Sequence, residues 1–265
     1  MNKTEFEKKM HDQTELPGDS ISTYDLKFIC HRYIEVMPLT KDKSVLEIGA
    51  GSIIGKEEMV ESSKFYVGAD LTEQNLLNCS KSNFSNELNL IRLDAHHIPF
   101  ADNSFDVIIA LAMIYYLDID DFLNEVRRVL KPGGKLFFCS SNKDLPGFVA
   151  SNFTKNYYSV DELNKKLAEN GFKAKFKGAF KEFKLGFYGK IFSILKETFK
   201  RLSLVIFGNN NFWLRLRSSY LGKKVIIPDS LNKFPDINVI SEEINSYEKN
   251  SKYKIIYCTA ILENP

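Results

Sequence analysis

The chain has 265 residues, of which 44% are hydrophobic and 26% are charged, and its formal net charge is +2. A chain of this length and composition folds into a globular protein with a sizeable core, as one large domain or one domain with an elaboration. The four cysteines are widely spaced without a Cys-x-x-Cys pair, which disfavours disulfides and a zinc site. The polar start lacks the apolar core of a signal peptide, and no apolar run approaches the roughly 20 residues of a membrane span, so we expect a cytoplasmic protein.

Residues 1–40 are predicted to form an N-terminal helical extension. The first 20 residues are charged and end in a Leu-Pro-Gly-Asp loop signal. From about 22 to 37, apolar residues recur at helical spacing. Ser20, Ser22 and Thr23 are candidate N-caps, and Pro38 is expected to close the helix.

A short apolar run at 45–48 predicts a strand that is buried on both faces. Glu47 lies near its end, and Gly49 and Gly51 follow before a helical pattern from about 54 to 63. Glycines let the backbone turn sharply and approach a ligand closely. An acidic residue at this position would repel a pyrophosphate and suits a ligand with positive charge or amine donors. The stretch therefore predicts a nucleotide-cofactor site.

The next two predicted strands also end in acidic residues. The run 65–69 is followed by Asp70, whose carboxylate suits the hydrogen bonds of a ribose diol. Alternatively, Asp70 or Thr72 caps the following helix, and both roles can hold together. The strand at 88–93 is followed by Asp94 and Ala95.

The second half continues the alternation of strands and helices. A strand is expected at 105–111, a helix at 119–130, and another strand after the Leu-Lys-Pro-Gly-Gly sequence at 130–134. Ser159 and Glu162 have the spacing of a capping box, and Gly171 ends that helix. A strand begins near 172, and residues 252–262 alternate as the final strand.

In this order, the features resemble the class I S-adenosylmethionine-dependent methyltransferases. Motif I of that family reads acid-x-Gly-x-Gly-x-Gly; here Glu47, Gly49 and Gly51 match, and Ile53 stands at the third glycine position. The Leu-Lys-Pro-Gly-Gly sequence is a frequent feature of the family. The resemblance covers about residues 40–180 and the last strand.

The resemblance implies a Rossmann-like α/β fold with a seven-stranded, mostly parallel sheet whose last strand is antiparallel. It divides the chain into a core of residues 41–180 and 251–265 and an inserted segment, 181–250, which we expect to form a mostly helical substrate cap. It implies S-adenosylmethionine as methyl donor and S-adenosylhomocysteine as product. The residues expected to bind this cofactor are Glu47, Gly49, Ala50, Gly51, Asp70, Leu71, Asp94, Ala95, Ala110 and Leu111.

The inserted segment is basic: residues 181–224 contain ten Lys or Arg residues against two glutamates, a local charge of +8. Arg215 and Arg217 are candidates for binding an anionic small-molecule substrate, such as a carboxylate or a phosphate-bearing sugar. Alternatively, a helix at 188–206 lies on a membrane surface to reach a lipid-linked acceptor, or the charges form a solvated face. Nucleic acid is not expected as a partner, because the overall charge gives little electrostatic footprint. The oligomeric state is open.

Methyl transfer is an in-line displacement, in which the protein positions the reactants and removes water. A hydroxyl acceptor benefits from a general base, whereas a neutral amine needs none. Candidate catalytic residues are Tyr115, Tyr116 and His97, with His96 as a neighbour. Tyr116 is also a candidate substrate contact.

Two other functions remain open. A nicotinamide-dependent oxidoreductase is disfavoured by Glu47 and by the absence of a G-x-G-x-x-G sequence. A non-catalytic protein with the methyltransferase fold remains possible because the third motif glycine is missing.

Overall fold

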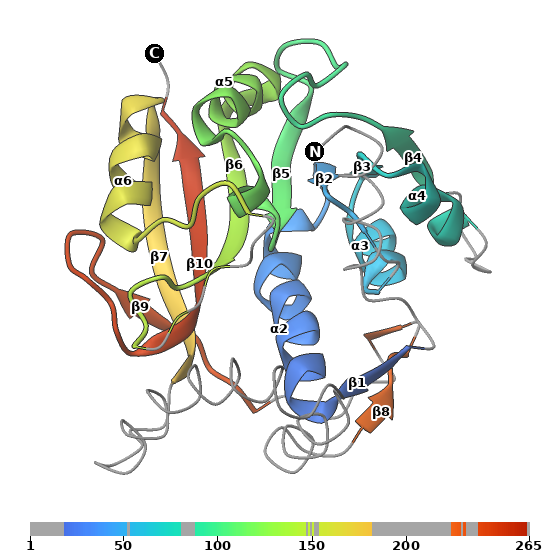
Figure 1. Ribbon diagram of the computed structural model, residues 1–265. Coiled ribbons are helices and arrows are strands. Elements are labelled where there is room, and N and C mark those ends of the chain that lie inside the picture. The colour runs from blue at the N-terminus through green and yellow to red at the C-terminus, as the bar shows by residue number, and fades with distance from the viewer. Residues whose placement is uncertain are drawn as a thin grey trace.

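The computed structural model describes residues 19–51, 54–80, 88–146, 148, 150, 154–181, 224–228, 230–231 and 238–263. In these ranges, a twisted sheet runs through the middle of the molecule with helices packed against both faces (Figure 1). Its strands are β2 (Ser44–Ile48), β3 (Phe65–Asp70), β4 (Asn89–Arg92), β5 (Phe105–Leu111), β6 (Leu130–Ser141), β7 (Phe172–Lys181), β9 (Glu242–Ile244) and β10 (Tyr253–Leu262).

The strand order is β4-β3-β2-β5-β6-β10-β7-β9. The first five strands in this order, β4, β3, β2, β5 and β6, are parallel. Strand β10 is inserted antiparallel between β6 and β7. The predicted α/β class and the antiparallel last strand are therefore confirmed. The sheet has eight strands instead of the expected seven, because β9 adds an edge beside β7. Three residues are too few for an alternating pattern to reveal such a strand.

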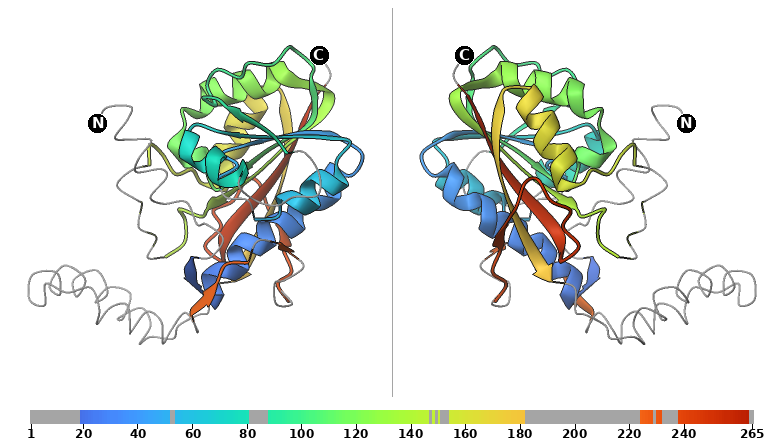
Figure 2. Two further views of the ribbon diagram at one scale, coloured as in Figure 1. Left: turned by 90° about the vertical axis from the view of Figure 1, so that its right-hand side faces the viewer. Right: turned by 90° about the vertical axis from the view of Figure 1, so that its left-hand side faces the viewer.

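Helices α2 (Thr23–Thr40) and α3 (Lys56–Ser62) cover one face of the sheet, and α5 (Ile119–Val129) and α6 (Val160–Glu169) cover the other (Figure 2). Strand β2 is buried on both sides: Leu46 and Ile48 pack in the cluster that includes α5 and α6, and Val45 packs in the cluster that includes α2. This double burial explains the continuous apolar run in the sequence.

The helix ends follow local chemistry, with one correction. Ser22 is the N-cap of α2, and its hydroxyl accepts a hydrogen bond from the backbone N–H of Asp25. The helix does not end at Pro38 as expected but continues to Thr40, because a proline in the last turn removes a single helical hydrogen bond. The predicted capping box of α6, between Ser159 and Glu162, is present.

The described part of the segment 181–250 consists of two short strands and connecting residues. Strand β8 (Lys224–Ile226) pairs antiparallel with β1 (Ser20–Ser22), and β9 pairs with β7. The helix expected at 188–206 lies outside the described residues, as do Arg215 and Arg217, so the division into a core and a mostly helical cap stays a prediction. None of the helices in the described ranges is long and apolar enough to cross a membrane.

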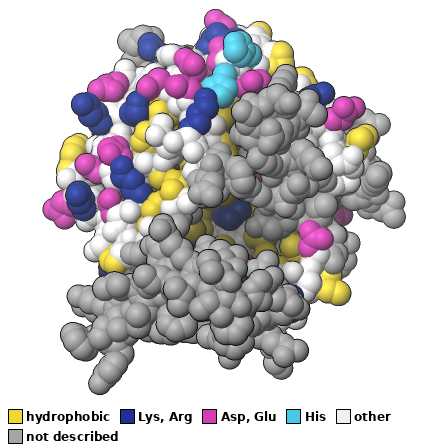
Figure 3. Space-filling model, in the orientation of Figure 1, with side chains coloured by type: hydrophobic (Ala, Val, Ile, Leu, Met, Phe, Trp, Pro, Cys, Tyr) yellow, Lys and Arg dark blue, Asp and Glu magenta, His cyan; other side chains and the backbone are white. Residues whose placement is uncertain are grey.

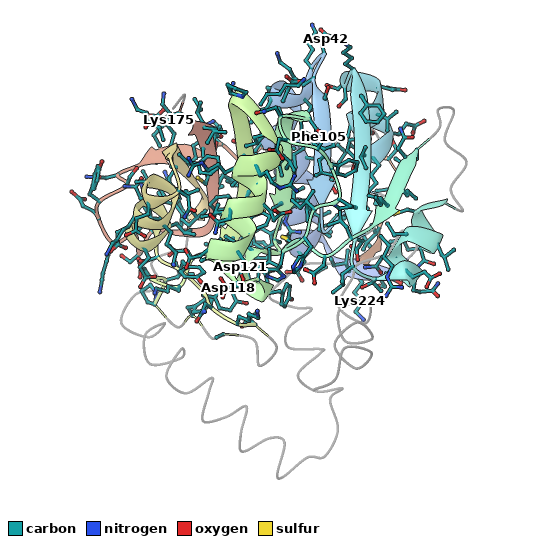
Figure 4. All side chains as sticks on the ribbon, turned by 90° about the horizontal axis from the view of Figure 1, so that it is seen from above. Asp42, Phe105, Asp118, Asp121, Lys175 and Lys224 are labelled. Atoms are coloured by element: carbon teal, nitrogen blue, oxygen red, sulfur yellow. The ribbon has the colours of Figure 1, made fainter. Side chains whose placement is uncertain are left out.

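The parallel strands place their two ends on opposite sides of the molecule. Asp42 precedes β2, and Asp118 follows β5 and caps α5; the two lie at opposite ends of the view in Figure 4. The turns that follow β2, β3 and β5 therefore meet at one edge, the carboxyl edge of the sheet, where ligands bind in open α/β folds.

Candidate functional site

The turn after β2 has a backbone that only glycine adopts easily. Gly49 has a φ of +69° and Gly51 a φ of +53°. A Cβ atom at Gly49 would lie 3.0 Å from the Cγ atom of Met113, which follows β5. The first motif glycine thus permits both the left-handed turn and its close packing against the end of β5.

Every backbone polar group of the next two residues of this turn has a partner. The bonds are Ala50 N–H to the Ala69 carbonyl (2.8 Å), Lys56 Nζ to the Ala50 carbonyl (2.7 Å), Gly51 N–H to Asp70 Oδ2 (2.8 Å) and the Cys79 thiol to the Gly51 carbonyl (3.2 Å). Neighbouring elements therefore hold the turn in one conformation.

Asp70 ends β3 and links the glycine turn to α4 (Glu73–Ser80). Its second oxygen, Oδ1, accepts hydrogen bonds from the Thr72 N–H at 2.8 Å and from the Asn75 amide at 3.3 Å. The next residue, Leu71, is half-buried, and its carbonyl accepts a hydrogen bond from Arg92 Nε at 3.0 Å. The two bonds to Oδ1 link Asp70 to the start of α4, but capping of that helix by Asp70 or Thr72 stays a prediction. Ribose binding by Asp70 stays a prediction.

Glu47 lies beneath the turn, in the core, with 1% of its surface exposed. It accepts hydrogen bonds from Tyr33 Oη at 3.1 Å and from Tyr66 Oη at 2.5 Å, and Lys56 Nζ lies 3.8 Å from its Oε1. Burial and the Glu47 charge raise the pKa of both tyrosines, which stay protonated as donors. In the structure the charge of this carboxylate is met by the buried Lys56. The predicted contact of Glu47 with a ligand that carries positive charge or amine donors stays a prediction.

The turn after β4 contains the second pair of predicted cofactor residues. Ala95 is buried in the core, and Asp94 is exposed. Partial burial works against ionisation, but hydrogen bonds from the backbone N–H and the ring of His96 lower the pKa of Asp94. Ala110 and Leu111, at the end of β5, are buried in the two opposite core clusters.

The two histidines, His96 and His97, differ in hydrogen bonding and in exposure. His96 Nδ1 lies 2.7 Å from an Asp94 oxygen, and His96 Nε2 lies 3.0 Å from the Asp118 N–H. Because an ionised carboxylate only accepts and a backbone N–H only donates, both ring nitrogens are committed in one neutral tautomer. His97 is exposed, and its backbone N–H closes the turn onto the Asp94 carbonyl.

Tyr115 and Tyr116 lie on a short 3₁₀ helix, η1 (Ile114–Tyr116), just after β5. Tyr115 stacks on Tyr157 at a ring distance of 4.8 Å, and Tyr157 contacts Phe148 at 4.7 Å. Burial raises the pKa of Tyr115, as does the neighbouring Tyr116. The Tyr115 hydroxyl is therefore fitted to donate a hydrogen bond rather than to accept a proton.

Several residues of this region were not found from the sequence. Tyr33, Lys56 and Tyr66 surround Glu47, and Tyr157 and Phe148 extend the aromatic group of Tyr115. Lys56 begins a Lys-Glu-Glu run that reads as a solvated helix start, and no local pattern marks the tyrosines.

Metal ligands and thiols are two further kinds of possible functional group. In the described ranges, no group of three His, Cys, Asp or Glu side chains is arranged to hold a metal ion. All four cysteines are buried free thiols. The space-filling view shows a hollow in the face seen in Figure 3, with hydrophobic side chains and a basic side chain visible within it.

Comparisons with known proteins agree with this arrangement. Residues 46–138 match the family model described as a methyltransferase domain. The chain is 33% identical to a demethylmenaquinone methyltransferase of Corynebacterium urealyticum over 42% of its length and 48% of that protein. It is 31% identical to a ubiquinone/menaquinone biosynthesis C-methyltransferase of Haemophilus ducreyi, over 53% of this chain and 58% of that one. The chain thus spans about half the length of these curated relatives.

Solved structures share the fold at low sequence identity. A SAM-dependent methyltransferase of Thermotoga maritima superposes with a TM-score of 0.52 at 16% identity, covering 90% of this chain and 91% of that one. One from Archaeoglobus fulgidus gives 0.53 at 14% identity, covering 89% and 94%. Residues 46–138 therefore match a methyltransferase domain, within a chain that shares the fold of these SAM-dependent methyltransferases.

Proposed function

We propose that this protein is a methyltransferase that transfers a methyl group from S-adenosylmethionine to an oxygen or nitrogen atom of a small molecule. The observation that carries the proposal is the junction of the glycine turn with Asp70, whose Oδ2 lies 2.8 Å from the Gly51 N–H at the carboxyl edge of the sheet. This junction lies within the segment that matches the methyltransferase domain.

The residues at this edge fit the proposed donor. The positive φ angles of Gly49 and Gly51 allow the tight backbone turn at the edge where a ligand would approach. Asp70 Oδ2 accepts one hydrogen bond and has a second lone pair for a ribose hydroxyl, whereas Oδ1 already accepts two hydrogen bonds. Nearby, Thr72 Oγ1 is buried without a hydrogen-bond partner in the described part of the chain, and it supplies a further polar contact.

When bound, S-adenosylmethionine supplies a methyl group activated by a sulfonium. The protein's own contribution is to hold the donor at Gly49–Gly51, Asp70 and Asp94, to orient the acceptor near Tyr115 and Tyr116, and to exclude water. Tyr115 would donate a hydrogen bond to the acceptor or pack against it. With His96 committed to Asp94 and Asp118, the exposed His97 is the histidine left as a candidate base for a hydroxyl acceptor, and a neutral amine needs no base.

For the methyl acceptor, the observations support only a broad class of molecule. The relatives named above act on quinone precursors by their names, and the half-buried aromatic rings of Tyr115 and Tyr157 would suit a planar or apolar acceptor. Arg215 and Arg217 remain our candidates for an anionic group on that acceptor, and the basic segment remains a candidate contact with a membrane surface.

Calorimetric titration with S-adenosylhomocysteine, with NADPH titrated in parallel, tests the proposal. We expect a dissociation constant in the micromolar range or tighter for S-adenosylhomocysteine, about −8 kcal/mol, and no binding of NADPH. Binding of NADPH alone would favour an oxidoreductase. Absence of both would favour the non-catalytic alternative.

A further inference from the structure

The side chains around Glu47 form a buried network that reaches the glycine turn from three different elements. Tyr33 comes from α2, Lys56 begins α3 and Tyr66 lies on β3. Lys56 has no exposed surface and Glu47 has 1%, so two opposite charges are removed from water together. Such a pair costs desolvation energy and is a weak source of stability by itself, which suggests that it has another role.

Lys56 connects this network to the turn directly. Its ammonium donates to the Ala50 carbonyl at 2.7 Å and lies 3.8 Å from Glu47 Oε1. The same Oε1 atom accepts the Tyr33 hydroxyl at 3.1 Å. The Glu47 carboxylate thus pairs with the Lys56 ammonium, and this ammonium holds the Ala50 carbonyl, between Gly49 and Gly51, by a hydrogen bond.

Tyr33 links α2 to the same hydrogen-bonded network. A Cβ atom at Gly55 would lie 2.7 Å from the Tyr33 ring, so the ring packs directly on the residue before Lys56. Gly55 itself has a φ of +76°. A change in the position of α2 would therefore move both the Glu47 carboxylate and the start of α3.

We propose that Lys56 is a positioning residue for the methyl donor, and that Tyr33, through Glu47, couples α2 to the glycine turn. This inference rests on the proposed function. In this proposal Glu47 acts on the turn through Lys56 and the two tyrosines, whether or not it also makes the donor contact that the family resemblance implies. The missing third motif glycine is compatible with this role, because side chains fix the turn at Ala50.

The test compares donor affinity and the local order of the turn in matched variants. Lys56→Met removes the donor to Ala50, and Tyr33→Phe removes only one hydroxyl from Glu47. Because Lys56→Met leaves a buried carboxylate and is at risk of not folding, the double variant Glu47→Gln/Lys56→Met removes both charges. Tyr257→Phe is the control: it deletes a buried hydroxyl that bonds His31 at 2.9 Å and comes from β10, which is separated from β2 by β5 and β6 in the sheet.

Two measurements are made on each folded variant at a temperature well below its unfolding transition. Titration with S-adenosylhomocysteine is expected to show affinity about tenfold weaker or more for the Lys56 variants, a smaller loss for Tyr33→Phe and no change for Tyr257→Phe. Hydrogen exchange followed by NMR is expected to show faster exchange of the Ala50 and Gly51 amides in the same order. A purely structural role would speed exchange across the core amides to a similar extent, whereas a positioning role concentrates the increase at Ala50 and Gly51.

The outcomes separate this inference from the proposed function. If the wild-type chain does not bind S-adenosylhomocysteine, the proposed function fails, and the exchange data alone decide whether Lys56 orders the turn. If the wild type binds and the folded double variant binds equally well with unchanged exchange at Ala50 and Gly51, the positioning role is refuted while the proposed function stands.

Discussion

Replacing Glu47 by Gln isolates the charge of the buried pair. The Glu47 carboxylate lies 3.8 Å from Lys56 Nζ, with 1% and 0% of the two side chains exposed. At an effective dielectric constant of about 20, two unit charges at this separation attract by about 4 kcal/mol. Removing one partner of a buried pair leaves the other uncompensated, and we expect Glu47→Gln to lower the free energy of unfolding by about 3–5 kcal/mol.

Urea denaturation followed by circular dichroism measures this loss from the transition midpoint at constant slope. The chain supplies a matched control, since Lys165 and Glu169 form an ion pair at 3.9 Å with 78% and 56% of their side chains exposed. Glu169→Gln removes the same charge at almost the same distance, and we expect little change because solvent screens an exposed pair.

The double variant Glu47→Gln/Lys56→Met completes the cycle. It is expected to recover part of the stability that Glu47→Gln loses, because no charge is left buried without a partner. A loss below about 1 kcal/mol in Glu47→Gln, or a double variant whose losses are simply the sum of the two single ones, would refute the argument.

Three further predictions concern the edge of the sheet. Asp70→Asn weakens S-adenosylhomocysteine binding by about tenfold or more in calorimetry, because the carboxylate that orders Gly51 and would bind the donor is lost. Gly49→Ala is expected to lower the free energy of unfolding, measured in urea, more than Gly133→Ala does. Gly133 has a similar φ of +73° but nothing within 4 Å of its Cβ position, whereas an alanine at position 49 also meets Met113. Equal losses in the two variants would contradict this. Because the pKa of Asp94 is lowered from 3.8 in the folded protein, its ionised form stabilises the fold above that pH, and the contribution is lost as pH falls through the lowered value. The stability difference between wild type and Asp94→Asn should therefore be present at pH 7 and shrink on acidification below about pH 4, as measured by urea midpoints.

Local sequence determined most of the fold. The apolar run at 45–48 marks a strand buried on both faces, and the glycines after it adopt positive φ as a turn requires. The bond from the Thr72 N–H to Asp70 and the Ser159 capping box follow from local sequence, because these partners lie within a few residues of each other. The bond from the Gly51 N–H to Asp70 spans 19 residues and depends on the fold. These features also placed the candidate site, since parallel strands bring their carboxyl ends to one edge.

Other features were decided only by tertiary structure. The partners of Glu47 come from α2, α3 and β3, and no spacing in the sequence brings Tyr33, Lys56 and Tyr66 together. Lys56 stands in a charged run, and only packing against Ala50 and Glu47 makes it a buried residue. The commitment of His96 likewise depends on Asp118 across the edge of the sheet. Burial and long-range pairing are properties of the folded chain as a whole. The sequence therefore determined where the candidate site lies, and the packing decided which partner each charged group in it has.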